Sequence, residues 1–464
     1  YLRNLAFFGM ATYSYKGRYT INGTLRYEGS NMLGKSRQAR WLPTWNVSGS
    51  WNAHEERWWA PTFGKAWTYA SLKASYSLTA DRGPASNSLA VFQSFTPWRP
   101  STSANESAII LAALENSELT YEKKNELNIG VALGFVDNRI NVEFDWYRRN
   151  NFDLIGYTQT MGVGGVTTKL ANDATMESTG CEFTISTTNI KTKDFKWTTD
   201  WIFGWAENTI TKLDSRSQVY SLVNGVGRTE GRPIGALYSI PFAGLTEEGL
   251  PTFFIDAEHT QVVGPGNYAD IYFQEYENID YLKYEGTIDP KITGSFGNTF
   301  SWKGLKLNVF FTYSFGNVLR LDNLCPVYSS DYSDLTASMK EMKNRWMVPG
   351  DENVTTIPSI PTVRQMREID ALSNAYSAYN YSTERVAKGD FIRLKELSLA
   401  YDLPKKYFEG QNAVSSFGVK LSATNLWLAY ADKKLNGRDP EYYNTGGVSS
   451  PVPRQFTLTV KLGF

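Results

Sequence analysis

Cysteine, histidine and long apolar runs are all scarce in this chain of 464 residues. The two cysteines, Cys181 and Cys325, lie far apart in the sequence, so they support neither a disulfide framework nor a thiolate metal site. The two histidines, His54 and His259, each lack a second imidazole nearby, which excludes a histidine-based zinc site. No run approaches the roughly 18 consecutive apolar residues of a transmembrane helix, so none is predicted.

An excess of charge of one sign is also missing, because 47 basic residues balance 47 acidic ones. This balance gives no electrostatic reason to expect nucleic acid as a partner. The acidic pairs Glu247-Glu248 and Asp351-Glu352 are expected in solvated loops, where nothing positions a second carboxylate for glycoside hydrolysis. His54 is expected to be a solvated histidine at a membrane interface. We therefore predict no catalytic residue, no metal site, no cofactor and no enzymatic activity.

Aromatic residues, in contrast, are abundant: they make up 14% of the chain, with 28 Tyr and 14 Trp. Rings that are apolar but carry a polar tip suit a protein with two membrane–water interfaces. The mean hydropathy of −0.37 is compatible with such a protein, because only alternate residues of a membrane β-barrel face lipid.

Alternation of apolar and polar residues is the strongest pattern, and it recurs along the whole chain. Residues 305–315 and 455–464 carry apolar residues at every second position, and 417–427 do so with one polar exception, Asn425. These segments are about 10–14 residues long, and a tilted strand crosses a bilayer with about 9–11 residues. A soluble sandwich or propeller also alternates, but its apolar faces would be shorter and its turns evenly spaced.

The connections between these segments fall into a short and a long class, as in outer-membrane barrels. Short connections are predicted at Lys16-Gly17, Asp137-Asn138 and Lys303-Gly304. Long external loops are predicted near 80–122, 151–174, 210–290, 318–388 and 429–452.

The strand count predicts that an amino-terminal part is missing. About thirteen strands can be assigned, and the first, near residues 4–14, runs down into a short turn. A complete bacterial barrel has an even number of strands and both termini in the periplasm. The chain also starts without a signal peptide, which an exported protein requires.

Several motifs resemble those of the SusC-like receptors, the Bacteroidetes branch of TonB-dependent transporters. Residues 391–404, FIRLKELSLAYDLP, closely follow the family segment Y-L-R-L-K-N-L-T-L-G-Y-T-L-P. Residues 42–52 resemble its P-S-x-S-x-x-W strand, whereas residues 426–430 depart from its N-L-F-x-x-T pattern. Further matches, which together cover nearly the whole chain, are residues 18–30, 72–79, 121–123, 128–130, 231–235, 425–426, 439–441 and 453–454.

The resemblance implies an all-β fold, a transmembrane antiparallel β-barrel in the cell outer membrane. Residues 1–464 would form a single barrel domain, about the last 13 strands of a barrel of about 22. The plug domain, the TonB-binding box and the amino-terminal extension of the family would be absent from this chain.

The function that the resemblance implies is nutrient import, by TonB-energised uptake of oligosaccharides or oligopeptides together with a SusD-like surface lipoprotein. TonB would act through the missing amino-terminal part. The other partners would be the remainder of the barrel with its plug, outer-membrane lipid, and the glycan or peptide substrate. Aromatic residues in the external loops suit stacking on such substrates. The predicted substrate-binding residues are Trp98, Tyr328, Tyr332, Tyr442 and Tyr443.

Two other functions are compatible with a β-barrel pattern. A passive diffusion channel would need this chain alone to close without a plug, and the odd strand count argues against it. A structural or adhesive surface protein predicts no enclosed lumen, and a polar face that is not uniformly rich in Ser, Thr, Asn and Gly.

Overall fold

The computed structural model describes residues 2–64, 66–83, 88–97, 107–163, 165–324, 340–404, 407, 415–443 and 451–463. The chain divides into two compact units, and each is described by itself. The first unit comprises residues 1–215, 230–232 and 298–300, and the second comprises residues 216–229, 233–297 and 301–464. Within the described part of the chain, no helix is both long and apolar enough to cross a membrane.

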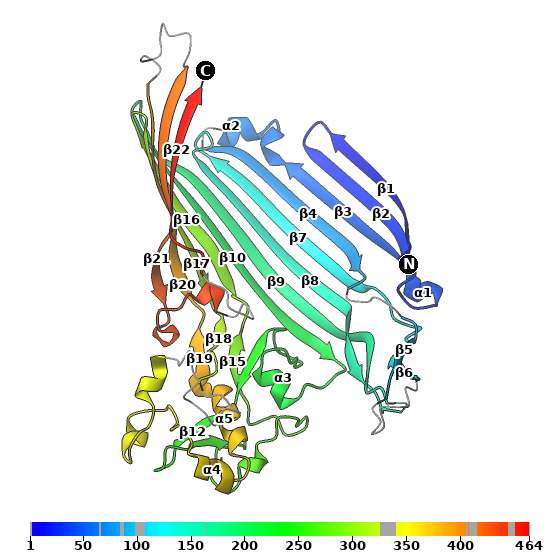
Figure 1. The fold of residues 1–464 in the computed structure, drawn as a ribbon. Helices are drawn as coiled ribbons and strands as arrows, with labels where there is room; N and C mark the ends of the chain where they lie inside the picture. The colour runs from blue at the N-terminus through cyan, green and yellow to red at the C-terminus, as the bar shows by residue number, and fades with distance from the viewer. Residues whose placement is uncertain are drawn as a thin grey trace. The chain divides into compact units, whose positions relative to one another are not determined.

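Thirteen strands follow one another in a single sheet, in an order that keeps the sequence order throughout. This confirms the strand count predicted from the alternation. The strands of the first unit lie side by side in Figure 1. In sheet order the strands are β1 (Asn4–Tyr15), β2 (Tyr19–Ser30), β3 (Trp41–Asn52), β4 (Trp67–Asp81), β7 (Glu122–Phe135), β8 (Ile140–Gln159), β9 (Thr168–Lys191), β10 (Phe195–Leu213), β16 (Ile292–Trp302), β17 (Leu305–Phe315), β20 (Phe391–Asp402), β21 (Ser416–Ala431) and β22 (Gln455–Gly463).

In the first unit, the antiparallel register aligns apolar residues of neighbouring strands into continuous rows. One row runs across five strands through Leu72, Val131, Phe144, Phe183 and Phe203. The row one position along lies on the opposite face and consists of Lys73, Gly130, Asp145, Glu182 and Gly204. Because successive side chains of a strand point to opposite faces, the unit has one apolar face and one polar face.

The second unit shows the same division across β17, β20, β21 and β22. Its apolar row contains Leu307, Leu399, Leu421 and Leu458. The adjacent polar row contains Asn308, Ser398, Ser422 and Thr457. These two rows define the apolar face and the polar face of the second unit.

Tight hairpins join the strands at the short connections that the sequence predicts. Lys16 and Gly17 between β1 and β2, and Lys303 and Gly304 between β16 and β17, all have positive φ angles. Hairpin turns with left-handed backbone match the twist of the strands, and glycine adopts this backbone without strain. At Gly304 a Cβ atom would also lie 2.6 Å from the carbonyl oxygen of Asp402, so a side chain does not fit.

The prediction that residues 151–174 form a loop is wrong for most of these residues. Strands β8 and β9 stay paired as far as Gln159 and Thr168, and only residues 160–167 connect them. Ile155 is buried with Leu33, Leu119 and Tyr121 in a small core that also takes up Leu170. Packing of this core extends the ladder beyond the length that a bilayer requires.

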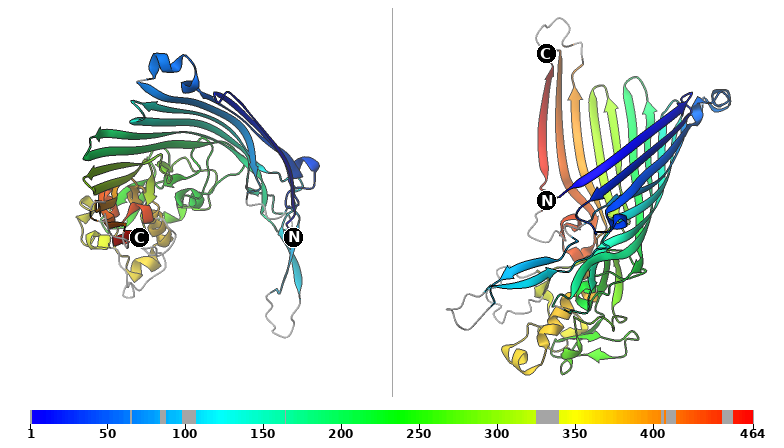
Figure 2. Two further views of the ribbon diagram at one scale, coloured as in Figure 1. Left: turned by 90° about the horizontal axis from the view of Figure 1, so that it is seen from above. Right: turned by 90° about the vertical axis from the view of Figure 1, so that its right-hand side faces the viewer.

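The other predicted loops contain secondary structure of their own. In the first unit, β5 (Val91–Phe95) pairs with β6 (Ala108–Ala113) inside 80–122, and α1 (Arg37–Arg40) and α2 (Trp59–Phe63) flank β3 (Figure 2). The second unit carries the remaining elements, which are α3 (Val219–Val223), β11 (Ala236–Ser239), β12 (Phe242–Leu245), β13 (Pro251–Phe254), β14 (Val262–Val263), β15 (Lys283–Thr287), β18 (Val318–Arg320), α4 (Val363–Glu368), α5 (Leu372–Asn380) and β19 (Val386–Lys388).

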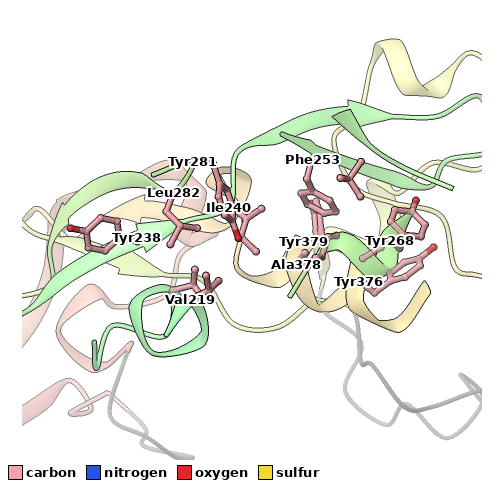
Figure 3. Close-up of a cluster of buried hydrophobic side chains, with 14 of the residues drawn as sticks. Val219, Tyr238, Ile240, Phe253, Tyr268, Tyr281, Leu282, Tyr376, Ala378 and Tyr379 are labelled. Carbon is pink, nitrogen blue, oxygen red and sulfur yellow. The ribbon is translucent and has the colours of Figure 1, made fainter. Parts of the chain in front are cut away.

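These loop elements of the second unit pack around a tyrosine-rich core, shown in Figure 3. Tyr268 is fully buried and donates its hydroxyl hydrogen to the carbonyl oxygen of Pro251 at 2.8 Å, and Tyr376 donates to Ser359 at 2.8 Å. Burial raises the pKa of Tyr281 to about 12. Because the hydroxyls of Tyr268 and Tyr376 are paired, these two rings fill the core without adding an unpaired polar atom.

The strand order places β1 and β22 at its two ends. Among the described residues, β1 forms its ladder with β2 and β22 forms its ladder with β21.

Charged substitutions on the two faces of β17 should have unequal costs. We expect Leu307→Arg, and Val460→Arg on β22, to lower the free energy of unfolding in lipid by about 2–4 kcal/mol near the bilayer midplane, because the guanidinium would face hydrocarbon. The matched variant Asn308→Arg, on the polar face, should cost clearly less. Equal costs for Leu307→Arg and Asn308→Arg in denaturant titrations would contradict the assignment of the faces.

Candidate ligand-binding cavity

A cavity of about 540 Å³ opens in the second unit. Strands β20 and β21 contribute Arg393, Asn425, Leu426 and Leu428. The remaining lining residues come from the connection after β18 and from the connection between β21 and β22. They are Asp322, Gly437, Arg438, Asp439, Tyr442, Tyr443, Pro451, Val452 and Arg454. Residues far apart in the sequence therefore form one polar and aromatic pocket.

Register shifts in β20 and β21 lie beside this cavity, one of them between Ile392 and Arg393. Glu396 pairs with Phe310 whereas Leu394 pairs with Phe311, so β20 carries an extra residue relative to β17. Between the pairs that Glu396 and Leu394 make with β21, two residues of β21, at 425 and 426, oppose one residue of β20. Such bulges bend a strand and redirect side chains, and they are frequent near functional sites.

Asn425 has a φ of 53° at its bulge, a left-handed conformation that asparagine tolerates better than most residues. Trp427, two residues further along, is 58% exposed, and Leu421 before the bulge is 52% exposed. The polar exception in the alternation of residues 417–427 therefore coincides with the bulge and with its left-handed residue.

Arg393 is the central charged group of the cavity. The residue is only 5% exposed, and its guanidinium pairs with the carboxylate of Asp439 and, at 3.3 Å, with that of Glu441. Asp439 also accepts a hydrogen bond from the backbone N–H of Glu441 at 3.1 Å, as a residue does at the start of a helical turn. A buried arginine with two carboxylate partners fixes the segment after β21 onto β20.

A second ion pair forms the neighbouring wall. Arg438 pairs with the carboxylate of Asp322 and lies over the ring of Tyr443, with 5.5 Å between the guanidinium carbon and the ring centre. The hydroxyl of Tyr443 accepts a hydrogen bond from the Asp322 backbone N–H at 3.3 Å. Burial raises the pKa of Tyr443, so this hydroxyl remains protonated at neutral pH.

The wall continues into the loop core through Arg385. Its Nη2 atom donates to the carbonyl oxygen of Asp322 at 2.7 Å, and its Nη1 atom pairs with Glu341 at 2.5 Å. Asn436 donates to the other oxygen of Glu341 at 2.9 Å. These contacts connect the cavity to the 3₁₀ turn at residues 340–344.

Two buried polar atoms at the cavity residues lack hydrogen-bond partners within the part of the chain that the structure describes. They are Nε of Arg393, a donor, and Oδ1 of Asn425, an acceptor. Arg454 adds an exposed guanidinium to the lining. The arrangement suits a ligand that offers both hydrogen-bond donors and acceptors.

The cavity brings together two of the five predicted substrate-binding residues, Tyr442 and Tyr443. Their role in binding stays a prediction. Trp98, Tyr328 and Tyr332 lie outside the described residues.

The sequence prediction missed the charged residues of the cavity, although its motifs include Arg393 and Asp439. The sequence carries a recognisable signal at Arg393 and at Asp439. Arg393 is a charge at the start of an otherwise regular strand, and Asp439 is followed by proline, a combination typical of a helical start. Within the described residues, no group of three or more His, Cys, Asp and Glu side chains is arranged to hold a metal ion.

The structure corrects the prediction made for His54. The expectation of a solvated side chain is wrong, because the ring packs against Tyr69 with 4.3 Å between ring centres. Its Nδ1 atom lies 2.9 Å from the carbonyl oxygen of Ala70, so the histidine is half-buried and supports the start of β4.

Comparison with known proteins gives the following picture. No family model matches the chain. The chain is 26% identical over 487 aligned positions to TonB-dependent receptor P3 of Formosa agariphila, covering 98% of this chain and 45% of that receptor. It is 27% identical to the TonB-dependent receptor SusC of Bacteroides thetaiotaomicron, over 45% of this chain and 21% of SusC. The chain thus spans about half the length of the curated relatives that it matches along its whole length.

Among solved structures, the RagAB peptide importer in its open-open state matches with a TM-score of 0.77 and 22% identity, covering all of this chain and 47% of the importer chain. This likeness shows the fold. The thirteen-stranded sheet corresponds to the carboxyl-terminal half of a TonB-dependent receptor barrel, and the matched receptors belong to a transporter family without enzymatic activity.

Removal of the central charge should destabilise the segment over β20. We expect Arg393→Gln to lower the free energy of unfolding by about 3 kcal/mol, because two carboxylates would lose their partner in a buried site. Amide hydrogen exchange at residues 432–443 should accelerate. The matched control is Arg364→Gln, which removes the exposed pair of Arg364 with Glu368 on α4 and should cost about 0.5 kcal/mol or less. Similar costs for the two variants would show that Arg393 does not fix this segment.

Proposed function

Because this chain is a SusC/RagA-type TonB-dependent receptor of the outer membrane, we propose that it imports oligopeptides or oligosaccharides with energy delivered through TonB. In this proposal the chain forms the carboxyl-terminal part of the barrel, and the cavity around Arg393 contacts the ligand. The wall binds and encloses the substrate, and it carries out no chemical step.

The observation that carries the proposal is the alignment of nearly the whole chain with TonB-dependent receptors of about twice its length. The strand order supports it, because β1 and β22 stand at the ends of the sheet. An unpaired N–H or C=O group in hydrocarbon costs several kcal/mol, so each end needs a neighbouring strand. We propose that strands outside this chain complete a barrel of about 22 strands, and that the plug and the contact with TonB lie in that part.

The two alternatives fit the structure less well. A passive channel made from this chain alone would require β1 to pair with β22, and the strand order does not join them. A structural or adhesive protein would not need the polar rows that cross the strands, such as Asn308, Ser398, Ser422 and Thr457.

A SusD-like lipoprotein is the proposed partner. The solved structure that this fold matches is called the RagAB peptide importer, and its name joins two components. In this chain, a packed core orders the long loops of the second unit, which gives a partner a preformed surface. Peptide is one proposed substrate class and glycan the other.

Uptake in cells tests the proposal. In a strain that depends on the complete receptor, we expect uptake of a labelled oligopeptide or oligosaccharide pool to stop when TonB is deleted. Uptake that persists at the same rate without TonB would favour the passive channel. No uptake of either pool by the complete receptor would favour the structural or adhesive protein.

Tyr442 should contribute directly to ligand binding. We expect Tyr442→Ala to weaken ligand binding by about tenfold, since a lost aromatic contact is worth up to about 1.4 kcal/mol. Tyr407→Ala is the matched control, because this exposed tyrosine lies in the connection after β20, outside the cavity. Binding by the purified complete receptor and the amount of assembled barrel should both be measured. Unchanged affinity in Tyr442→Ala would exclude this tyrosine from the binding site.

A further inference from the structure

The connection between β3 and β4 in the first unit contains a short aromatic helix, α2, with two different sides. Trp59 is 6% exposed, whereas Trp58 and Phe63 are 48% and 37% exposed. Figure 1 shows α2 at the end of β3 and β4, the end at which the tight hairpin between β1 and β2 also lies. This segment has no role in the proposed transport site.

The buried side of α2 packs on the apolar face of the sheet. Trp59 and Ala70 form a small core against which Trp51, Trp67 and Leu133 also pack. Trp51 is paired in register with Leu72, and Ala70 with Leu133, so these residues belong to the rows of the apolar face. Leu72 in the same rows is 42% exposed, so the described residues leave this face open at that position. The helix therefore lies on the face that meets lipid.

Polar contacts hold the segment in this position. The indole N–H of Trp59 donates to the carbonyl oxygen of Trp67 at 2.9 Å, so the ring is buried without an unsatisfied donor. Glu56, just before the helix, pairs with Arg18 at 3.2 Å and accepts a hydrogen bond from the hydroxyl of Tyr19 at 2.5 Å. These contacts tie the start of α2 to the hairpin end of β2.

The outer side of α2 has the composition of a membrane-interface anchor. Trp58 contacts Trp59 and Phe63, with ring centres 5.6 and 6.4 Å apart, and its other side faces outward. Within the described residues, its indole N–H makes no hydrogen bond, which leaves a donor for lipid phosphate or carbonyl groups. Exposed Arg57 supplies a cation beside it. Tryptophan prefers this boundary, where its ring is in the acyl region and its N–H reaches the headgroups.

We propose that α2 is a lipid-binding anchor that inserts Trp58 and Phe63 into the phospholipid headgroup boundary at the hairpin end of the barrel. The occupant of this surface is phospholipid, because the core beneath α2 belongs to the apolar face of β3, β4 and β7. The inference is independent of the transported substrate and of TonB.

Nitroxide accessibility in the complete receptor, reconstituted in phosphatidylethanolamine–phosphatidylglycerol nanodiscs, tests the proposal. The label is attached to Trp58→Cys in a background that carries Cys181→Ala and Cys325→Ala. Tyr76→Cys on the apolar face is the lipid reference, and Lys193→Cys in the short connection between β9 and β10 is the aqueous reference. Retained heat-modifiable migration in electrophoresis shows that each variant is folded.

We expect the ratio of oxygen to nickel-chelate collision rates at position 58 to be several-fold higher than at position 193 and closer to the value at position 76. A ratio equal to that at position 193 would place α2 in the aqueous phase and overturn the proposal. Shielding from both reagents would show that a protein covers the helix, which would also overturn it.

Discussion

Backbone pairing without water is the constraint on which this structure depends. In hydrocarbon each N–H and C=O group must find its partner in a neighbouring strand, and antiparallel ladders provide such partners without interruption. The ladder then fixes which side chains share a face. A shift of one residue between β4 and β7 would bring Lys73 into the row of Val131, so the apolar rows and the ladder specify the same register.

The proposed functions lie where this regularity is broken. Bulges in β20 and β21 turn Asn425 away from the apolar pattern and open the cavity next to Arg393. The buried charge of Arg393 is stabilised by Asp439 and Glu441, which belong to the following connection. At the hairpin end, α2 interrupts the plain turn between β3 and β4 and adds aromatic surface to the apolar face.

The sequence predicts the sheet well because its signal is local. Alternation within about ten residues is enough to place a strand and its faces, and the thirteen strands follow from it. The extension of β8 and β9 could not be predicted, since it depends on Ile155 packing with residues from three other segments. The cavity could not be predicted for the same reason, because its contacts join residues far apart in the sequence. Arg393 pairs with Asp439, 46 positions away, and Arg438 pairs with Asp322, 116 positions away. Of the predicted aromatic residues, Tyr442 and Tyr443 line one cavity, and their role in binding stays a prediction. A tyrosine in a loop carries no local sequence signal of the residues that surround it.

The central claim is that this chain is one part of a larger barrel with lipid on its apolar face. An electron cryomicroscopy map of the complete receptor in lipid nanodiscs measures this directly, through the neighbours of the two end strands. The account predicts that β1 and β22 are each hydrogen-bonded to a strand from outside residues 1–464, with Leu307 and Leu399 facing lipid. Direct pairing of β1 with β22, in a barrel closed by these thirteen strands alone, would contradict it.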